Sequence, residues 1–431
     1  MKKIFLSSIT FFVIASAANF IYPAAASAVP AGSDEKIFSH VFQSNKNNII
    51  QVSAIYKNQN VVGSGFITKE GFIITANHVV GTSSTIKMVY QNVTYVLRAC
   101  YRDHANDVAV LYPIEFINSF NSYEYVPYDS LKTNNFTYEE TAPKKDDSIM
   151  VIGYPFGIVE TKRIIGKYKE TKNRYLSDVQ LYACDLSVIN GCSGGPVFNK
   201  SGRIIGIATS AETAPTATEY LVSYVSPIKN IEKITEFITP EYMDKIKEIS
   251  KGFPGLNLSV SNLRTNFYSS IEYQNIGFNK ELNTFVNKSD SGSIMLKEKD
   301  SVIDLFFNIL CGNLNKDSES KNLVDIYIKK TDENNYIALR MDYSSNNYYL
   351  LYVSNGAATV KPPVISMPII TDTFYNIEIR TKGKNMGIWF DNIPVYSDND
   401  LPVSEGQTGI TFQGINKVVI DNLFFSLPIV Y

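Results

Sequence analysis

Apolar residues between positions 49 and 226 occur in short runs, and Gly, Asn, Asp and Pro residues separate these runs. Such runs are typical of short β-strands joined by tight turns, as in an all-β barrel or sandwich. We therefore predict an all-β fold class for this part of the chain. The polar, Tyr-rich segment 118–147 interrupts the pattern, and we expect it to form a long surface loop between two halves of the domain.

The hydrophobic spacing changes after Ser226. Isoleucines recur there at helical intervals, at Ile228, Ile231, Ile234, Ile238, Ile246 and Ile249. Thr239-Pro240-Glu241 interrupts them with a typical helix start, so the pattern predicts two short helices. Residues 251–257, which include Gly252-Phe253-Pro254-Gly255, are expected to form a linker.

Residues 258–431 again have the pattern of strands. Residues 375–380 alternate apolar and polar side chains, and turn residues follow at 383–385 and at Asp391-Asn392. The pattern predicts a second β-domain, a sandwich. Trp389 is the only tryptophan, and we expect it to be structural, with stacking on a sugar as the alternative. The acidic residues of this region (Asp391, Asp398 and Asp400) are expected to be solvated turn residues rather than calcium ligands.

The N-terminus resembles a secretory signal. Met1-Lys2-Lys3 is basic, residues 4–21 are mainly apolar, and Ala24-Ala25-Ala26-Ser27-Ala28 is a cleavage-type sequence. We predict a signal peptide at residues 1–28 and a secreted or periplasmic protein. No later stretch approaches the ~20 apolar residues of a spanning helix, so we expect no membrane anchor after cleavage.

Charge and cysteine content exclude some classes of function. The 40 Lys and Arg residues nearly balance the 42 Asp and Glu residues, which argues against a nucleic-acid partner. Four cysteines, Cys100, Cys184, Cys192 and Cys311, are far apart and match no metal-ligand spacing. Export would permit disulfides, but the sequence does not choose between a pairing and free buried thiols. We expect no cofactor and no metal site.

Three segments contain residues suited to nucleophilic catalysis, in the chain order His, Asp, Ser. They are Thr75-Ala76-Asn77-His78-Val79-Val80, Asn106-Asp107-Val108-Ala109-Val110-Leu111 and Gly191-Cys192-Ser193-Gly194-Gly195-Pro196. A serine hydroxyl needs an adjacent base, and the base needs a carboxylate that orients it. We predict His78, Asp107 and Ser193 as catalytic residues, and the N–H groups of Gly191 and Ser193 as an oxyanion hole.

Asp103 and Cys192 are alternative candidates for the carboxylate and for the nucleophile. Asp103 also precedes the apolar run, but Asp107 abuts it directly, so we expect Asp103 in a turn. Cys192 could be a nucleophile in its own right, but the Gly-x-nucleophile-Gly-Gly spacing favours Ser193. Of the other histidines, His40 and His104 are expected to have no catalytic role.

Residues 49–238 resemble the trypsin/chymotrypsin-like serine peptidases, and especially their HtrA/Deg branch. The resemblance rests on the three segments above, on Asp103 with Asp107, and on the segments Gly63-Ser64-Gly65-Phe66-Ile67, Gly153-Tyr154-Pro155-Phe156-Gly157 and Gly202-Arg203-Ile204-Ile205-Gly206-Ile207. It implies a two-barrel protease domain at residues 36–250, with the helices at its C-terminal end. It also places Ser187 in the substrate pocket, which implies small or medium apolar side chains in the substrate.

The tail after the linker shows no sign of the PDZ module common in that branch. It resembles the concanavalin-like jelly-roll sandwich of lectin and laminin-G modules, through residues 334–340, 409–412 and 419–423. We therefore expect an exported serine endopeptidase that cleaves protein or peptide substrates and binds a protein or glycan through residues 258–431. The alternative is a secreted binding protein built on a latent protease scaffold.

Overall fold

The computed structural model describes residues 33–426 with gaps. The gaps are 57–58, 82, 84–85, 118–122, 126–130, 132–135, 159, 174–178, 214–219, 230, 232–237, 245–270, 280–283, 301, 316–320, 364–366 and 403–404. The predicted signal peptide, residues 1–28, and the predicted linker, residues 251–257, lie outside the described residues. Within the described part, no helix is long and apolar enough to cross a membrane.

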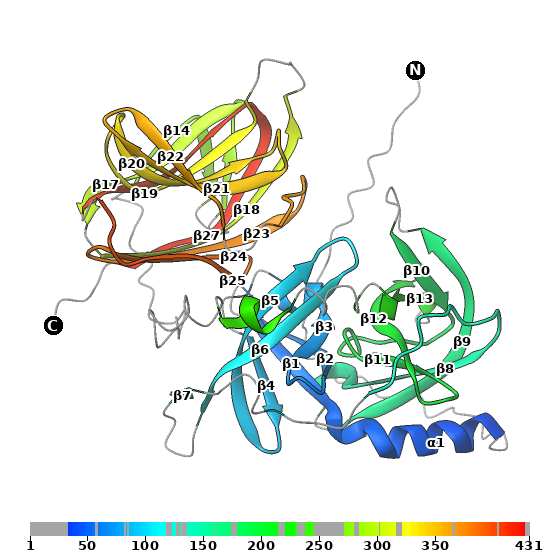
Figure 1. Ribbon diagram of the computed structural model, residues 1–431. Helices are drawn as coiled ribbons and strands as arrows, with labels where there is room; N and C mark the ends of the chain where they lie inside the picture. Colours follow the sequence, from blue (N-terminus) through cyan, green and yellow to red (C-terminus); the bar gives the residue numbers. More distant parts are fainter. Residues whose placement is uncertain are drawn as a thin grey trace, which may run out of the picture.

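The first half of the chain folds into two antiparallel β-barrels (Figure 1). The first contains β1 (Ile49–Tyr56), β2 (Gln59–Ile67), β3 (Ile73–Ala76), β4 (Ile86–Tyr90), β5 (Val93–Asp103) and β6 (Val108–Ile117), and β7 (Tyr123–Tyr125) extends it beyond β6. Pairing of β3 with β6 closes this barrel. The prediction of an all-β fold with two barrels is confirmed.

The second barrel contains β8 (Ser148–Gly153), β9 (Lys162–Asn173), β10 (Gln180–Cys184), β11 (Pro196–Asn199), β12 (Ile204–Thr213) and β13 (Tyr220–Pro227). Its interior is lined by apolar side chains such as Val151, Val197 and Val225. The turn between β10 and β11 contains Ser193, so the predicted nucleophile belongs to this barrel and the predicted base to the other.

The segment between the barrels differs from the expected surface loop. Leu131 and Phe136 are buried. The Phe136 ring lies 5.3 Å from that of Phe66 in the first barrel and 6.2 Å from that of Phe198 in the second. This part of 118–147 therefore joins the two barrels through an apolar contact, because burying its few large apolar side chains is favourable.

Helix α1 (Ser33–Asn45) precedes the barrels. Its buried residues, Phe38 and Val41, are three positions apart and so lie on one face. Asp34 accepts a hydrogen bond from Ser148 of β8 and pairs with Lys200, which attaches the helix to the second barrel.

After β13 the chain is helical at 228–229, 231 and 240–244. Ile228, Ile231 and Met243 are buried, in agreement with the helical spacing of the isoleucines. The positions Ile246 and Ile249 of the second predicted helix lie outside the described residues.

The C-terminal strands form two seven-stranded sheets, which Figure 1 shows as two stacked layers above the first barrel. One sheet has the order β14 (Ile271–Gln274), β17 (Ser291–Asp300), β26 (Gly406–Gln413), β19 (Leu323–Asp332), β20 (Asn335–Asp342), β21 (Asn347–Ser354), β22 (Ala357–Lys361). The other has the order β15 (Ile276–Asn279), β16 (Thr284–Asn287), β27 (Ile415–Ser426), β18 (Val302–Leu314), β23 (Phe374–Lys382), β24 (Asn385–Phe390), β25 (Ile393–Asp398). A sandwich was expected here.

Both faces of strand β23 are buried. Ile377 and Ile379 belong to the apolar core, and Glu378 and Arg380, which alternate with them, are also buried. Glu378 pairs with Arg98 of β5, so this outer face of the sheet lies against the first barrel. Trp389 of β24 is fully buried, with Arg98 and Arg380 close to its ring. The structural role expected for Trp389 is confirmed, and its burial excludes stacking on a sugar.

Candidate active site

His78 lies between strands β3 and β4 of the first barrel. Strand β3 is buried along its whole length, and the short helix α2 (Asn77–Val80) follows it directly. Asp107 precedes β6, and the β3–β6 register sets Ala76 opposite Val108. Pairing of these two strands therefore brings the residues that flank their ends, His78 and Asp107, side by side.

The contact between His78 and Asp107 has two parts. His78 Nδ1 lies 2.7 Å from Asp107 Oδ2, and the backbone N–H of His78 donates to Asp107 Oδ1 at 2.8 Å. A carboxylate can only accept, so Nδ1 has the hydrogen and Nε2 is the acceptor. The imidazole side chain is 43% exposed. His78 is thus held in the tautomer that a general base requires, with its ring accessible to solvent.

The backbone of Ser193 packs against the segment that leads to His78. Ser64 of β2 donates its N–H to the Ser193 carbonyl oxygen at 2.7 Å. A Cβ on Gly194 would meet Ser64 O at 2.2 Å and Ala76 N at 2.6 Å, so only glycine fits here. The Ser193 hydroxyl donates to the carbonyl oxygen of Thr209 at 3.3 Å. The structure therefore pairs His78 with Asp107 directly, whereas the hydrogen bond of Ser193 goes to β12.

The turn around Ser193 leaves two amide groups available. The N–H groups of Cys192, Gly194 and Gly195 donate to backbone carbonyl oxygens. Among the described residues, no acceptor receives the N–H of Gly191 or of Ser193. Gly191 has a φ of 95°, and a Cβ there would lie 2.2 Å from Tyr154 O. This conformation needs glycine, and it leaves two donors that could serve a developing oxyanion.

Asp103 and Cys192 differ from the predicted catalytic residues in their surroundings, and Asp103 is the last residue of β5, where we expected a turn residue. Asp103 accepts hydrogen bonds from the N–H and side-chain amide of Asn106, and so shapes the turn before Asp107. Cys192 is buried, and burial raises the pKa of its thiol to about 11. A thiol with that pKa is protonated near neutral pH and is a poor nucleophile.

All four cysteines are buried and unpaired. Of the two alternatives left open by the sequence, the structure has free thiols. Burial raises the pKa of Cys184 and of Cys311 to about 12 each, which makes these thiols unreactive.

Ser187 lies in the loop between β10 and the Ser193 turn. It is exposed, between buried Leu186 and Val188. Buried Ser223 of β13 anchors both neighbours: it donates to the Leu186 carbonyl oxygen and accepts the N–H of Val188 at 3.4 Å. The nearby carboxylate of Asp185 pairs with Lys169.

Sequence reasoning missed a group of polar residues behind His78. Arg102 and His104 of the first barrel contact Asp391 of the C-terminal domain, and both also contact Asn77. The expectation that Asp391 is a solvated turn residue was wrong, because its side chain is 1% exposed. No local pattern could have indicated the contact, since Arg102 and Asp391 are 289 positions apart. Asp400, in contrast, is 86% exposed, as expected.

The part of the chain that contains the candidate site is similar to known proteins. Residues 63–207 match the family described as trypsin-like peptidase domain. A probable periplasmic serine endoprotease DegP-like protein of Rhizobium meliloti is 26% identical, over 46% of this chain and 36% of that protein. An HtrA-like serine protease of Staphylococcus aureus is also 26% identical, over 41% of this chain and 23% of that protein. The chain thus spans about a third or less of the length of these relatives.

Solved structures similar to this chain include the active form of the Rv3671c protease from M. tuberculosis. It is 18% identical with a TM-score of 0.39, over 48% of this chain and 85% of that one. The serine endoprotease from Yersinia pestis is 20% identical with a TM-score of 0.37, over 46% of this chain and 65% of that one. Residues 63–207 are similar to trypsin-like peptidase domains, and the curated relatives of this region are serine proteases of the HtrA-like and DegP-like kinds.

Proposed function

We propose that this protein is an exported serine endopeptidase that acts through His78, Asp107 and Ser193. The observation that carries the proposal is the pair of hydrogen bonds from His78 to Asp107, at 2.7 and 2.8 Å, beside a glycine-rich turn that contains a serine. The predicted signal peptide at residues 1–28 and the periplasmic DegP-like relative support export.

The chemistry follows from the roles of these groups. Ser193 Oγ attacks the scissile carbonyl carbon while His78 Nε2 takes the hydroxyl proton, and Asp107 stabilises the resulting imidazolium. The N–H groups of Gly191 and Ser193 stabilise the oxyanion. Collapse of the tetrahedral intermediate transfers that proton to the leaving amine and forms an acyl-enzyme. Water, deprotonated by His78, then attacks the ester, and the carboxylic acid product leaves with Ser193 restored.

The loop that contains Ser187 supports a preference for small or medium apolar side chains in the substrate. Position 187 has no acidic group to attract Lys or Arg, and the nearby Asp185 is paired with Lys169. A peptide library with varied residues before the cleaved bond tests this preference. Preferred cleavage after Lys or Arg would contradict it.

The C-terminal sheets, residues 258–431, are proposed to be a concanavalin-like jelly roll that binds a protein or glycan partner. The buried position of Trp389 means that any glycan would be bound by other residues. A glycan array probed with the Ser193→Ala protein tests the glycan alternative, and absence of binding to any glycan would contradict it.

A latent protease scaffold is the second candidate function. The hydrogen bond from the Ser193 hydroxyl to Thr209 favours it, because that hydrogen must leave Thr209 before His78 can take it. Labelling of the purified protein with a fluorophosphonate probe, beside Ser193→Ala, separates the two candidates. Labelling lost in the variant supports the endopeptidase, and an unlabelled but folded protein supports the scaffold.

A further inference from the structure

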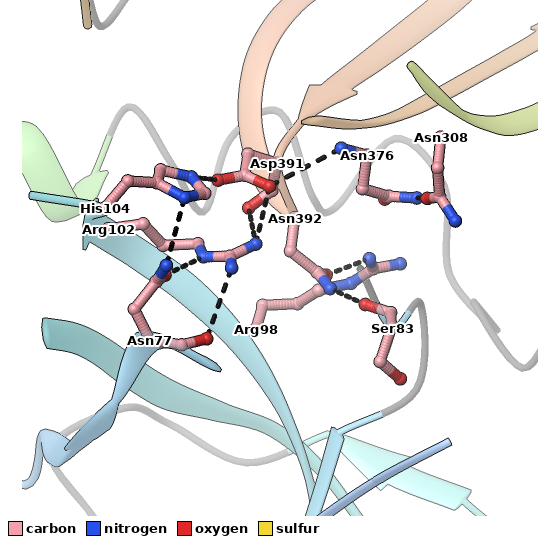
Figure 2. A network of polar contacts seen from close by, with 9 residues as sticks. All are labelled: Asn77, Ser83, Arg98, Arg102, His104, Asn308, Asn376, Asp391 and Asn392. Atoms are coloured by element: carbon pink, nitrogen blue, oxygen red, sulfur yellow. Dashed lines mark hydrogen bonds and ion pairs between the residues drawn. The ribbon is translucent and has the colours of Figure 1, made fainter. Parts of the chain in front are cut away.

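A buried polar network connects the C-terminal domain to the residue before His78 (Figure 2). Arg102 of β5 donates from Nη1 to Asp391 Oδ1 and from Nε to Asn77 Oδ1, both at 2.6 Å. His104 Nε2 lies 2.6 Å from Asp391 Oδ2, and its Nδ1 lies 3.1 Å from Asn77 Nδ2. Asp391 therefore reaches Asn77 through two side chains at once.

The donors and acceptors of this network fit one arrangement. Arg102 has only donors, so the oxygen of the Asn77 side chain faces Arg102 and the amide nitrogen faces His104. His104 Nδ1 then accepts from Asn77, and His104 Nε2–H donates to Asp391. Each link is satisfied by a single choice of amide orientation and imidazole tautomer, so the network fixes Asn77 in one position.

Asn77 is also in direct contact with the catalytic pair of the proposed function. Its backbone N–H donates to the carbonyl oxygen of Asp107 at 3.1 Å, and the next residue is His78. Arg102 adds a contact from Nη2 to the Asn77 carbonyl oxygen at 3.4 Å. Any movement of Asn77 would therefore move the two residues whose hydrogen bond orients the base.

The turn between β24 and β25 places Asp391 in this contact. Asp391 and Asn392 have φ values of 55° and 71°, which suit a two-residue hairpin turn between β24 and β25. Asp391 is buried, which raises its pKa, but Arg102 and His104 outweigh this effect and its pKa lies below the usual value. The aspartate is thus ionised, and a buried carboxylate of this kind needs its partners.

We propose that Asp391 is a positioning residue for His78 and Asp107, so that docking of the C-terminal domain assembles the active site. The proposal rests on the proposed endopeptidase function. The C-terminal domain then has a role in turnover that is separate from binding a target, because it holds Asn77 through Arg102 and His104.

The test compares two buried inter-domain ion pairs in the full chain. Asp391→Asn removes the charge that Arg102 and His104 share. Glu378→Gln is the matched control, because Glu378 pairs with Arg98 in the same contact between domains but none of its contacts reaches Asn77. We expect Asp391→Asn to lower kcat by about 10- to 100-fold with KM changed less than about twofold, since small misplacements of catalytic groups have effects of this size. Glu378→Gln should leave kcat within about twofold.

Equal losses of kcat in Asp391→Asn and Glu378→Gln would show that any weakening of the contact between the domains lowers activity. Asp391 would then have no specific positioning role, and the proposal would be overturned. An unchanged kcat in Asp391→Asn would also overturn it. If Asp391→Asn does not fold, His104→Gln replaces it: this variant breaks one of the two links and leaves Asp391 paired with Arg102. A smaller decrease in kcat at constant KM is expected there, and no decrease would contradict the proposal.

A second readout separates this proposal from the proposed function. The chain has only three histidines, His40, His78 and His104, so ring signals of labelled histidine can be assigned by substitution and followed by NMR. Asp391→Asn should move the His78 signals, and Glu378→Gln should leave them in place. If the His78 signals move only in Asp391→Asn but the protein shows no Ser193-dependent cleavage, the positioning role is retained and the peptidase function is rejected. If the protein cleaves peptides but its His78 signals do not move in Asp391→Asn, the positioning role is rejected and the peptidase function is retained.

Discussion

Asp107 and Asp391 are two aspartates with similar backbones and different surroundings. Each has a positive φ, 57° and 55°, in the turn before a strand. Asp107 is 29 positions from its partner His78 and beside a ring that is 43% exposed. Asp391 is 289 positions from Arg102, and both side chains are 1% exposed. The His78–Asp107 pair joins residues of one domain and is accessible to a substrate. The Arg102–Asp391 pair joins two domains and is buried, so its role is to hold the domains together.

The largest effect is expected at the His78–Asp107 pair, where a substitution should lower the rate of cleavage. Asp107→Asn should lower kcat by about 10⁴-fold, because the amide favours the wrong tautomer of His78. Stability should change little, since the site is partly exposed. Asp103→Asn is the control from the same turn and should keep most of the activity. Steady-state cleavage of a peptide measures both, and similar losses in the two variants would refute the assignment of Asp107.

Removal of a buried inter-domain charge should act on stability. Glu378→Ala leaves Arg98 and Arg380 without their carboxylate in a buried contact, and removal of one partner from such a pair costs about 3–5 kcal/mol of unfolding free energy. Chemical denaturation of the full chain measures the change. A loss below about 1 kcal/mol would mean that water reaches the inter-domain contact. The buried inter-domain pairs and the partly exposed His78–Asp107 pair would then differ less in energy than their burial suggests.

Acid should weaken the buried contact between the domains. Burial raises the pKa of Glu378, but Arg98 and Arg380 outweigh this, and its pKa, like that of Asp391, lies below the usual value. Groups with a lowered folded-state pKa stabilise the protein above the unfolded-state pKa, about 4 for these types, and this stabilisation is lost as pH falls through the folded-state value. Unfolding free energy should therefore be constant from about pH 7 to 5 and decrease below about pH 4.

Glu378→Gln checks the source of that decrease. Because the glutamine cannot titrate, the variant should lose less stability than the wild type over the same acidic range. Denaturation curves at matched pH values compare the two proteins. Identical pH dependence would assign the acid sensitivity to other carboxylates.

The smallest effect is expected at an exposed ion pair of the same domain. Asp400 pairs with Lys384, and their side chains are 86% and 57% exposed. Asp400→Ala should leave the unfolding free energy unchanged within the error of denaturation, because solvent screens such pairs. A clear loss would show that exposure alone does not separate the weak ion pairs from the strong ones in this chain.

Local sequence was enough to predict several parts of the protein. The all-β pattern of residues 49–226, the strands of the C-terminal half and the isoleucine face at 228–231 follow from apolar spacing within a few residues. The two-barrel arrangement was implied by the resemblance to trypsin/chymotrypsin-like peptidases. The His78–Asp107 contact agrees with the motifs in the sequence, and the antiparallel pairing of β3 with β6 sets the two residues side by side. The choice of Asp107 over Asp103 depended only on which aspartate abuts the strand.

Other features were not predictable in this way. The barrel contact of Phe136 and the inter-domain position of Trp389 depend on which surfaces meet after folding. The sequence pattern predicts no helix before the barrels, yet α1 begins at Ser33. Its charged residues Asp34 and Glu35 are fixed by Lys200 and Arg163, which are far away in the sequence.

The sequence by itself determined the fold class, the two β-regions and the identity of the residues suited to catalysis, because strand periodicity and motif chemistry are encoded by neighbours along the chain. Only the tertiary structure decided that all four thiols are buried and free, that the Ser193 hydroxyl bonds to Thr209, and that Asp391 lies behind His78. These outcomes depend on burial and on contacts between segments that are distant in the sequence. Asp400 and Asp391 are both aspartates of the C-terminal domain, yet Asp400 is exposed to solvent and Asp391 is buried in an ion pair.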